Sequence, residues 1–273
     1  MDYVAFIAGL PEIARDDRKL PLAMEEFREQ LAYYLKGKDR ALLDLFFLPN
    51  DHVQVLRLLR KQEAAEGLRT VYPLAVLEAA VANPDADRQL PGYLREFIAD
   101  YKEERLRGET SEENVLSGMY YDHMMRSRNR MVREYAEFVM NVRNLAAALN
   151  ARKYGREVAR EVVGDNAFAR ALRTSNAKDF GLAQDYEFVD RVVSLMNNDD
   201  LVARERGLDM LVWDFLDEAV TFEYFSVERV MAYLLQLLIV ERWSRMDSES
   251  GRKVFREMVE RLRKSFQFDE QFK

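Results

Sequence analysis

Three arginines have the type and spacing to bind an anionic partner. Arg126, Arg130 and Arg133 are separated by four and three residues, so on a helix they share one face. The planar guanidinium group suits carboxylates and phosphates, because it donates hydrogen bonds to them in pairs. A second interpretation is a solvated face in which the arginines pair with Glu134 and Glu137. The sequence leaves both interpretations open.

These arginines begin a basic block inside an acidic chain. Residues 126–178 hold twelve lysines and arginines against five aspartates and glutamates, a balance of +7, whereas the whole chain carries −7. The remainder therefore sums to −14, and the excess of positive charge in the block is more than local pairing absorbs. We expect a partner-binding surface on this block. Its members would be Arg126, Arg130, Arg133, Arg143, Arg152, Lys153 and Asn176.

Residues 173–181 form a segment dense in hydrogen-bonding side chains that ends in phenylalanine and glycine. Such a segment either fixes a tight local turn or makes a defined contact with a partner. We favour the structural role, in which Asn176 and Asp179 accept hydrogen bonds from backbone amides.

Residue patterns that would support catalysis are missing from the sequence. His52 and His123 lie far apart and neither has metal-ligand spacing, so both are interpreted as surface or core-edge imidazoles. The pair Asp199 and Asp200 is interpreted as a helix cap and not as a magnesium site. There is no phosphate-binding glycine loop, dinucleotide fingerprint or nucleophile elbow. We therefore expect no enzyme activity, no metal and no cofactor; an enzyme with an all-helical pocket is the least favoured class.

Composition favours helices. The 273 residues include only 11 glycines and 6 prolines, and few breakers in a long chain favour an all-α fold built from long helices. The absence of cysteine fits a reducing compartment. The N-terminus shows no signal peptide, and the apolar run at 230–240 is shorter than the ~20 residues that span a bilayer. We expect a cytoplasmic protein, and its acidic charge argues against indiscriminate nucleic-acid binding.

A long apolar stripe predicts one continuous helix. From Leu116 to Leu149 the apolar positions recur in steps of three and four, interrupted only by Ser127. The pattern predicts a single helix from Glu112 to Tyr154, a stiff rod of roughly 60 Å.

Helix-capping residues, together with glycine and proline, predict the domain boundary and the remaining helices. We treat residues 1–273 as one all-helical domain with a sub-boundary near 108–111, where Ser111 would cap the long helix. The segment 3–11 suits either a strand or a short buried helix. Further helices are expected at 167–174, at 201–215 after an Asp200 cap, at 227–245 after a Ser226 cap, and at 251–266.

Several motifs resemble known families. Residues 144–155 resemble the N-L-x6-R-K pattern of the central-stalk family of V/A-type ATPases, which comprises the C subunit of archaeal-type complexes and the d subunit of the eukaryotic vacuolar type. Residues 225–243 are similar to the closing helix of that family. Residues 171–182, together with Leu20-Pro21 and the stretch 129–134, resemble more closely a bacterial family encoded beside V/A-type ATPase genes.

This resemblance implies a fold and a role. The fold would be an elongated, funnel-like bundle with pseudo-repeated three-helix units and no active site. The role would be a central-stalk adaptor that couples the rotor shaft to the membrane ring, peripheral at the inner face of the cell membrane and without direct nucleotide contact. The alternative is a helical scaffold, unrelated to the ATPase, that binds an acidic protein or RNA.

Overall fold

The chain is helical throughout the part that the structure describes. The computed structural model describes residues 3–84, 88–106, 108 and 110–247, and these contain thirteen α-helices and no strand. The all-α prediction is confirmed. The funnel shape and the three-helix repeats stay predictions. The predicted helix at 251–266 lies outside the described residues. The helices are α1 (Tyr3–Ala8), α2 (Met24–Tyr34), α3 (Gly37–Asp44), α4 (Leu48–Leu59), α5 (Leu74–Ala82), α6 (Gly92–Lys102), α7 (Glu112–Met125), α8 (Arg130–Lys153), α9 (Val158–Glu161), α10 (Ala167–Thr174), α11 (Phe188–Met196), α12 (Leu201–Ala219) and α13 (Val227–Asp247).

The chain divides into two compact units. One comprises residues 1–36 and 216–273, and the other comprises residues 37–215. The segment 108–111 lies inside the second unit, between α6 and α7. The assignment of one domain to the whole chain stays a prediction.

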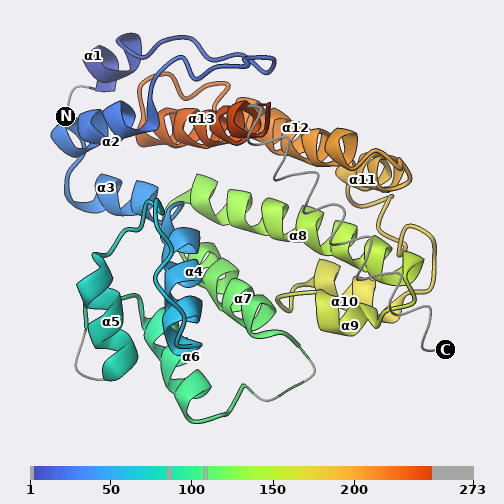
Figure 1. Cartoon of the computed structure of the whole chain (residues 1–273). Coiled ribbons are helices and arrows are strands. Elements are labelled where there is room, and N and C mark those ends of the chain that lie inside the picture. The colour runs from blue at the N-terminus through green and yellow to red at the C-terminus, as the bar shows by residue number, and fades with distance from the viewer. Residues whose placement is uncertain (1–2, 85–87, 107, 109, 248–273) are drawn as a thin grey trace. The chain divides into compact units, whose positions relative to one another are not determined.

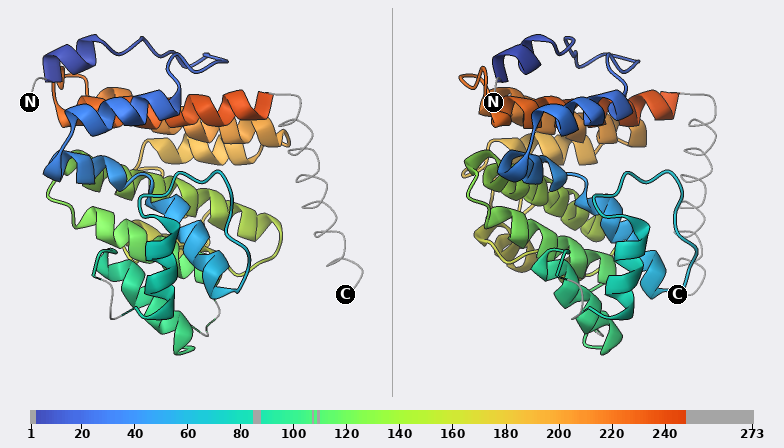
Figure 2. Two further views of the ribbon diagram at one scale, coloured as in Figure 1. Left: turned by 60° about the vertical axis from the view of Figure 1, so that its left-hand side comes forward. Right: turned by 90° about the vertical axis from the view of Figure 1, so that its left-hand side faces the viewer.

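The first unit packs α1 and α2 against α13 (Figures 1 and 2). Phe27 of α2 joins both partners, because its ring lies 6.3 Å from that of Phe6 and 5.3 Å from that of Tyr233. A polar contact completes the unit: the carboxylate of Asp217 accepts hydrogen bonds from Gln236 at 2.7 Å and from Arg15 at 2.6 Å. Gln236, which interrupts the apolar run at 230–240, therefore has a hydrogen-bond partner within the first unit.

The predicted single rod is wrong, because the chain turns between α7 and α8. The Asn129 side chain accepts a hydrogen bond from the Val132 amide at 3.1 Å and caps α8. The Ser127 hydroxyl accepts one from the Asn129 amide at 3.2 Å. Short polar side chains compete with the helix for backbone groups in this way. The two helices then lie side by side in the second unit (Figure 1), and most of the apolar stripe is buried in the core of that unit.

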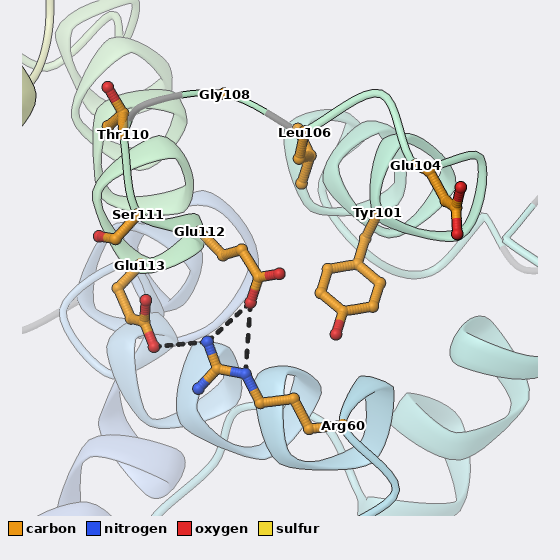
Figure 3. A pocket seen from close by; sticks show the side chains of 9 residues that line it. All are labelled: Arg60, Tyr101, Glu104, Leu106, Gly108, Thr110, Ser111, Glu112 and Glu113. Carbon is orange, nitrogen blue, oxygen red and sulfur yellow. Dashed lines mark hydrogen bonds and ion pairs between the residues drawn. The ribbon is translucent and has the colours of Figure 1, made fainter.

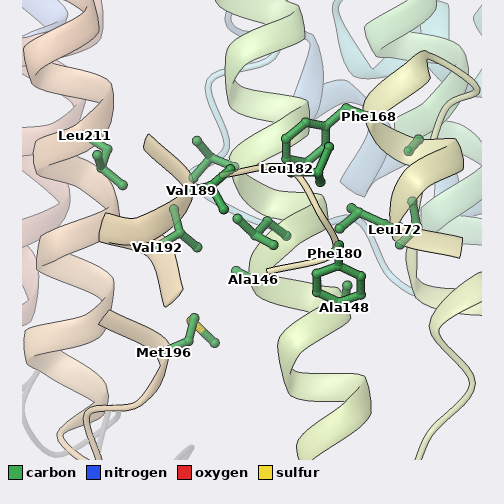
Figure 4. Packing of buried hydrophobic residues seen from close by; sticks show 14 residues of the cluster. Ala146, Ala148, Phe168, Leu172, Phe180, Leu182, Val189, Val192, Met196 and Leu211 are labelled. Carbon is green, nitrogen blue, oxygen red and sulfur yellow. The ribbon is translucent and has the colours of Figure 1, made fainter. Parts of the chain in front are cut away.

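Helix α8 is the centre of the second unit. A hydrophobic cluster gathers around its C-terminal half and includes Phe168 and Leu172 of α10, Val189 and Val192 of α11, and Phe180 (Figure 4). All five side chains are buried. Short helices that bury too little surface alone are stabilised by this shared packing.

Local cap signals were mostly reliable. Ser111 and Asp200 each accept a hydrogen bond from an amide in the first turn of the following helix, as predicted, and Asn166, which was not predicted as a cap, does the same for α10. Ser226 does the same at the longer distance of 3.4 Å. The open choice at residues 3–11 is resolved in favour of the short helix α1.

None of the helices among the described residues is long and apolar enough to cross a bilayer.

Gly164 supports the packing of α8 and gives a stability test. Its φ of +74° lies in the left-handed region, and a Cβ at this position would lie 2.7 Å from the Met140 sulfur. Gly67 has a similar φ of +71° and open space around it. We predict that Gly67→Ala costs about 1 kcal/mol for backbone strain, and that Gly164→Ala costs about 1–3 kcal/mol more through overpacking. Urea unfolding of both variants measures the difference, and equal losses would contradict the packing of Gly164 against Met140.

Candidate functional site

The structure places the predicted binding residues in two separate regions. Arg126, Arg130 and Arg133 lie at the turn between α7 and α8, which we call the arginine turn (residues 126–133). Arg152 lies at the other end of α8, roughly 33 Å from Arg130 at the helical rise of 1.5 Å per residue. Lys153 and Asn176 belong to that far end as well. The seven residues therefore do not form one continuous surface.

Arginines at the turn have different roles. Arg126 pairs with Asp122, and Arg130 pairs with Glu134 at 2.7 Å, while both arginine side chains remain about four-fifths exposed, at 78% and 82%. Arg133 instead donates two hydrogen bonds to backbone carbonyl oxygens of residues 127 and 128, at 2.9 and 3.0 Å. It therefore closes the turn.

Arg128 completes the exposed charge of the arginine turn. Its side chain is exposed and makes no hydrogen bond or ion pair within the described part of the chain. The flanking pairs of Arg126 and Arg130 join residues four apart on an exposed helix surface, where such pairs contribute little to stability. A carboxylate or phosphate on a partner can exchange with these weak pairs, so the turn is suited to an anionic partner.

Arg143 joins the two helices of this pair. Its Nη1 donates a 3.0 Å hydrogen bond to the hydroxyl of Tyr121, which places the guanidinium of α8 on α7. Its side chain is nevertheless exposed, so this hydrogen bond does not withdraw its charge from a partner.

At the far end of α8, Arg152 holds the segment 173–181 in place. Its guanidinium lies 3.4 Å from the centroid of the Phe180 ring and donates hydrogen bonds to the carbonyl oxygens of Ser175 and Ala177. Burial lowers its pKa. Phe180 is itself buried and has a φ of +57°, an uncommon backbone conformation for a residue other than glycine. Arg152 is thus committed to the fold.

Of the two hydrogen bonds predicted within the segment, the structure contains one. Asp179 accepts a 3.0 Å hydrogen bond from the Gly181 amide, as predicted, and backbone hydrogen bonds lower its pKa. The same prediction for Asn176 is wrong, because its exposed side chain makes no hydrogen bond within the described residues. Lys153 is exposed as well and lies 3.6 Å from the carboxylate of Asp199. Asn176 of the segment, and Lys153 beside it, are therefore exposed to a partner.

Sequence reasoning missed a pocket of about 560 Å³ beside the start of α7 (Figure 3). Arg60, which follows α4, reaches into it and pairs with Glu112 at 2.7 Å and with Glu113 at 2.6 Å. Burial alone would raise the pKa of Glu113, but the hydrogen bond from Arg60, a backbone hydrogen bond and the charge of Arg60 together outweigh it, and the pKa is lowered. The only signal in the sequence was the acidic first turn of α7. These pairs fix α4 against that turn, so the charges of the pocket serve the fold.

Both histidines meet in a buried aromatic cluster that the sequence did not reveal. A 2.7 Å hydrogen bond joins His52 Nε2 to the hydroxyl of Tyr93, and the Tyr93 ring lies 4.9 Å from that of His123. Burial lowers the pKa of His52 to about 3 and raises the pKa of Tyr93, so both groups are neutral near pH 7. Beside them Asp51, fully buried, accepts hydrogen bonds from the Val71 and Tyr72 amides. Among the described residues, no group of histidine, aspartate or glutamate side chains could hold a metal ion.

Comparison with known proteins identifies the family. Residues 1–266 match the model of the family described as protein of unknown function (DUF2764), and the chain belongs to that family. No curated protein and no solved structure matches the chain.

The Arg152 contact predicts a selective loss of stability. Arg152→Ala should lower the free energy of unfolding by about 2 kcal/mol, because two charge-assisted hydrogen bonds and the contact with Phe180 are lost. Its neighbour provides the control: Lys153→Ala removes an exposed ion pair and should cost less than about 1 kcal/mol. Urea unfolding gives both values, and hydrogen exchange should show faster opening at residues 175–181 in Arg152→Ala alone. Similar losses in the two variants would refute the role of Arg152.

The buried His52 predicts a dependence of stability on pH. In the folded chain this imidazole stays neutral down to pH about 3, whereas in the unfolded chain it binds a proton below its ordinary pKa of 6.5. The contribution of the neutral His52 to the free energy of unfolding is therefore fully present above pH 6.5. It falls by roughly 1.4 kcal/mol per pH unit as the pH decreases toward 3. Asp51 acts in the opposite direction, because burial raises the pKa of its carboxyl group.

Comparison with His52→Gln separates these contributions, since glutamine keeps an acceptor for Tyr93 and does not titrate. Between pH 6.5 and 5 the wild-type chain should lose about 2 kcal/mol more stability than the variant. Unfolding curves at both pH values test this. Parallel losses in the two proteins would show that His52 is not buried in its neutral form.

Proposed function

We propose that this chain is a non-catalytic adaptor in the central stalk of a V/A-type rotary ATPase, where it couples the rotor shaft to the membrane ring for ion transport. The observation that carries the proposal is the resemblance of residues 144–155, 171–182 and 225–243 to the stalk family and to the bacterial family encoded beside these ATPases. The all-helical fold is compatible with it.

Packing inside the second unit supports a mechanical role. Asn144 of α8 exchanges two hydrogen bonds with the backbone of Val163, at 2.8 and 2.9 Å, and Asn141 accepts one from Asn166 at 2.9 Å. Both asparagines of α8 are buried. Buried polar pairs that are satisfied rigidify a core, because alternative arrangements would leave them unpaired. Stiffness then comes from close packing around α8 and not from an extended rod.

Charge at the arginine turn supports a docking role. Exposed arginines orient an acidic partner as it approaches and fix its register, and such residues affect mainly the association rate and its salt dependence. We assign the shaft or the ring as the partner of this turn. In this proposal the chain lies at the cytoplasmic face of the membrane, is not inserted, and contacts neither nucleotide nor nucleic acid.

The exposed arginines also favour a second candidate function, a helical scaffold that binds an acidic protein or RNA outside the ATPase. Phosphates are recognised by the same guanidinium groups, and retention on RNA would then fall steeply with salt. The two functions predict different molecules bound to the native chain: ATPase subunits for the first, and RNA or another acidic protein for the second.

The arginine turn gives the decisive variant. The triple change Arg126→Glu, Arg128→Glu and Arg130→Glu reverses three exposed charges and leaves Arg133 to close the turn. We predict that this variant binds the detergent-solubilised ATPase at least roughly tenfold more weakly than the wild-type chain. Binding is measured with tagged chain on ATPase prepared from cells that lack it, and circular dichroism checks the helical content.

A matched control reverses three exposed charges elsewhere, in Lys19→Glu, Lys36→Glu and Lys38→Glu. It should bind like the wild-type chain. Failure of the wild-type chain to bind the ATPase would overturn the proposal, and salt-sensitive recovery of RNA in its place would establish the second function. Equal weakening of both triple variants would remove the arginine turn as the contact.

A further inference from the structure

The loop between α12 and α13 exposes three large aromatic side chains. Phe222, Tyr224 and Phe225 have exposed fractions of 85%, 60% and 53%. None of the three makes a ring contact or a hydrogen bond within the described residues. Single exposed apolar residues are common on protein surfaces, but three within four positions form a patch. We call residues 218–225 the aromatic loop; it comprises the last two residues of α12 and most of the connection to α13, and it belongs to the first unit (Figures 1 and 2).

Both ends of this loop are fixed. At its start, the Thr221 hydroxyl donates to the Asp217 carbonyl at 3.0 Å, and the carbonyl of the buried Val220 accepts the Glu223 amide at 3.0 Å. At its end, Ser226 caps α13. The aromatic side chains are therefore held outward by an ordered backbone, and a partner would spend little entropy on ordering the loop.

The charges of the loop indicate what kind of partner fits. Glu218 and Glu223 are exposed and have no cationic partner within the described part of the chain. The nearest cation along the chain, Arg229, lies in the first turn of α13 and is half-buried. Aromatic faces attract arginine and lysine side chains, and these exposed carboxylates reinforce that preference. An anionic membrane surface is disfavoured, because these carboxylates would face its negative charge.

We infer that the aromatic loop is a docking surface for a basic segment of a partner protein. Arginine or lysine side chains of that segment lie over the aromatic rings and pair with Glu218 and Glu223. Aromatic residues commonly supply most of the binding energy at such contacts, surrounded by polar groups. This inference is independent of the proposed function, because the aromatic loop and the arginine turn lie in different units and favour partners of opposite charge.

The test uses the full chain and two synthetic helical peptides. One peptide consists of leucine and arginine, and the other has glutamate at every arginine position. Each peptide carries an environment-sensitive dye, so that binding is followed without changing the loop. The arginine peptide should bind and change the dye signal, whereas the glutamate peptide should not.

Two variants distinguish the contacts. Phe222→Ser, Tyr224→Ser and Phe225→Ser together should weaken binding of the arginine peptide at least roughly tenfold. Glu218→Lys with Glu223→Lys should weaken it to a similar extent and allow the glutamate peptide to bind. The control Glu63→Lys with Glu66→Lys carries the same change of charge on an exposed loop of the other unit and should leave both affinities within about twofold.

Several results would overturn the inference. They are an absence of peptide binding, binding that survives the triple serine change, or equal effects of the two charge-reversal variants. Self-association that disappears with the triple serine change would assign the loop to a second copy of this chain. Tighter peptide binding after removal of residues 248–273 would assign it to that segment of the same chain. Either outcome would show that the loop binds something other than a basic segment of a partner protein.

Discussion

The turn between α7 and α8 is the constraint on which the second unit depends. Asn129 caps α8, and Arg133 binds the carbonyl oxygens of Ser127 and Arg128, so the backbone groups freed at the break are satisfied locally. Because the chain reverses here, most of the apolar stripe is buried within the second unit, against α10 and α11 as well as between α7 and α8. The surface left for recognition is polar and lies at the turn. A partner would therefore be selected mainly by charge at this place.

Other polar side chains of α8 make contacts within the second unit. Its asparagines bind the segment that precedes α10, and Arg152 closes over Phe180 at its end. Several charges that looked available in the sequence are thus occupied. Two exposed surfaces of different chemistry are the arginine turn in one unit and the aromatic loop with acidic neighbours in the other. Surfaces of opposite charge preference would suit unlike partners, as the proposed adaptor role requires.

Local signals in the sequence predicted much of this fold. Side-chain caps such as Ser111 and Asp200 need only the next few residues, and they marked helix starts correctly. Periodicity failed at Ser127, because a stripe with steps of three and four looks the same in one long helix and in two helices that pack together. The contact of Arg152 with Phe180 and the meeting of His52 with Tyr93 join residues far apart in the chain. Their proximity depends on tertiary packing, which spacing alone does not encode.

We propose that the chain is a stalk component of a V/A-type ATPase. Its abundance in ATPase purified from native membranes through a different component of the complex, followed by imaging of the particles, tests this directly. We predict a stoichiometric amount, with helical density between the rotor shaft and the membrane ring that vanishes when the gene is deleted. Intact ATPase that lacks the chain, purified from cells that express it, would rule out a place in the stalk.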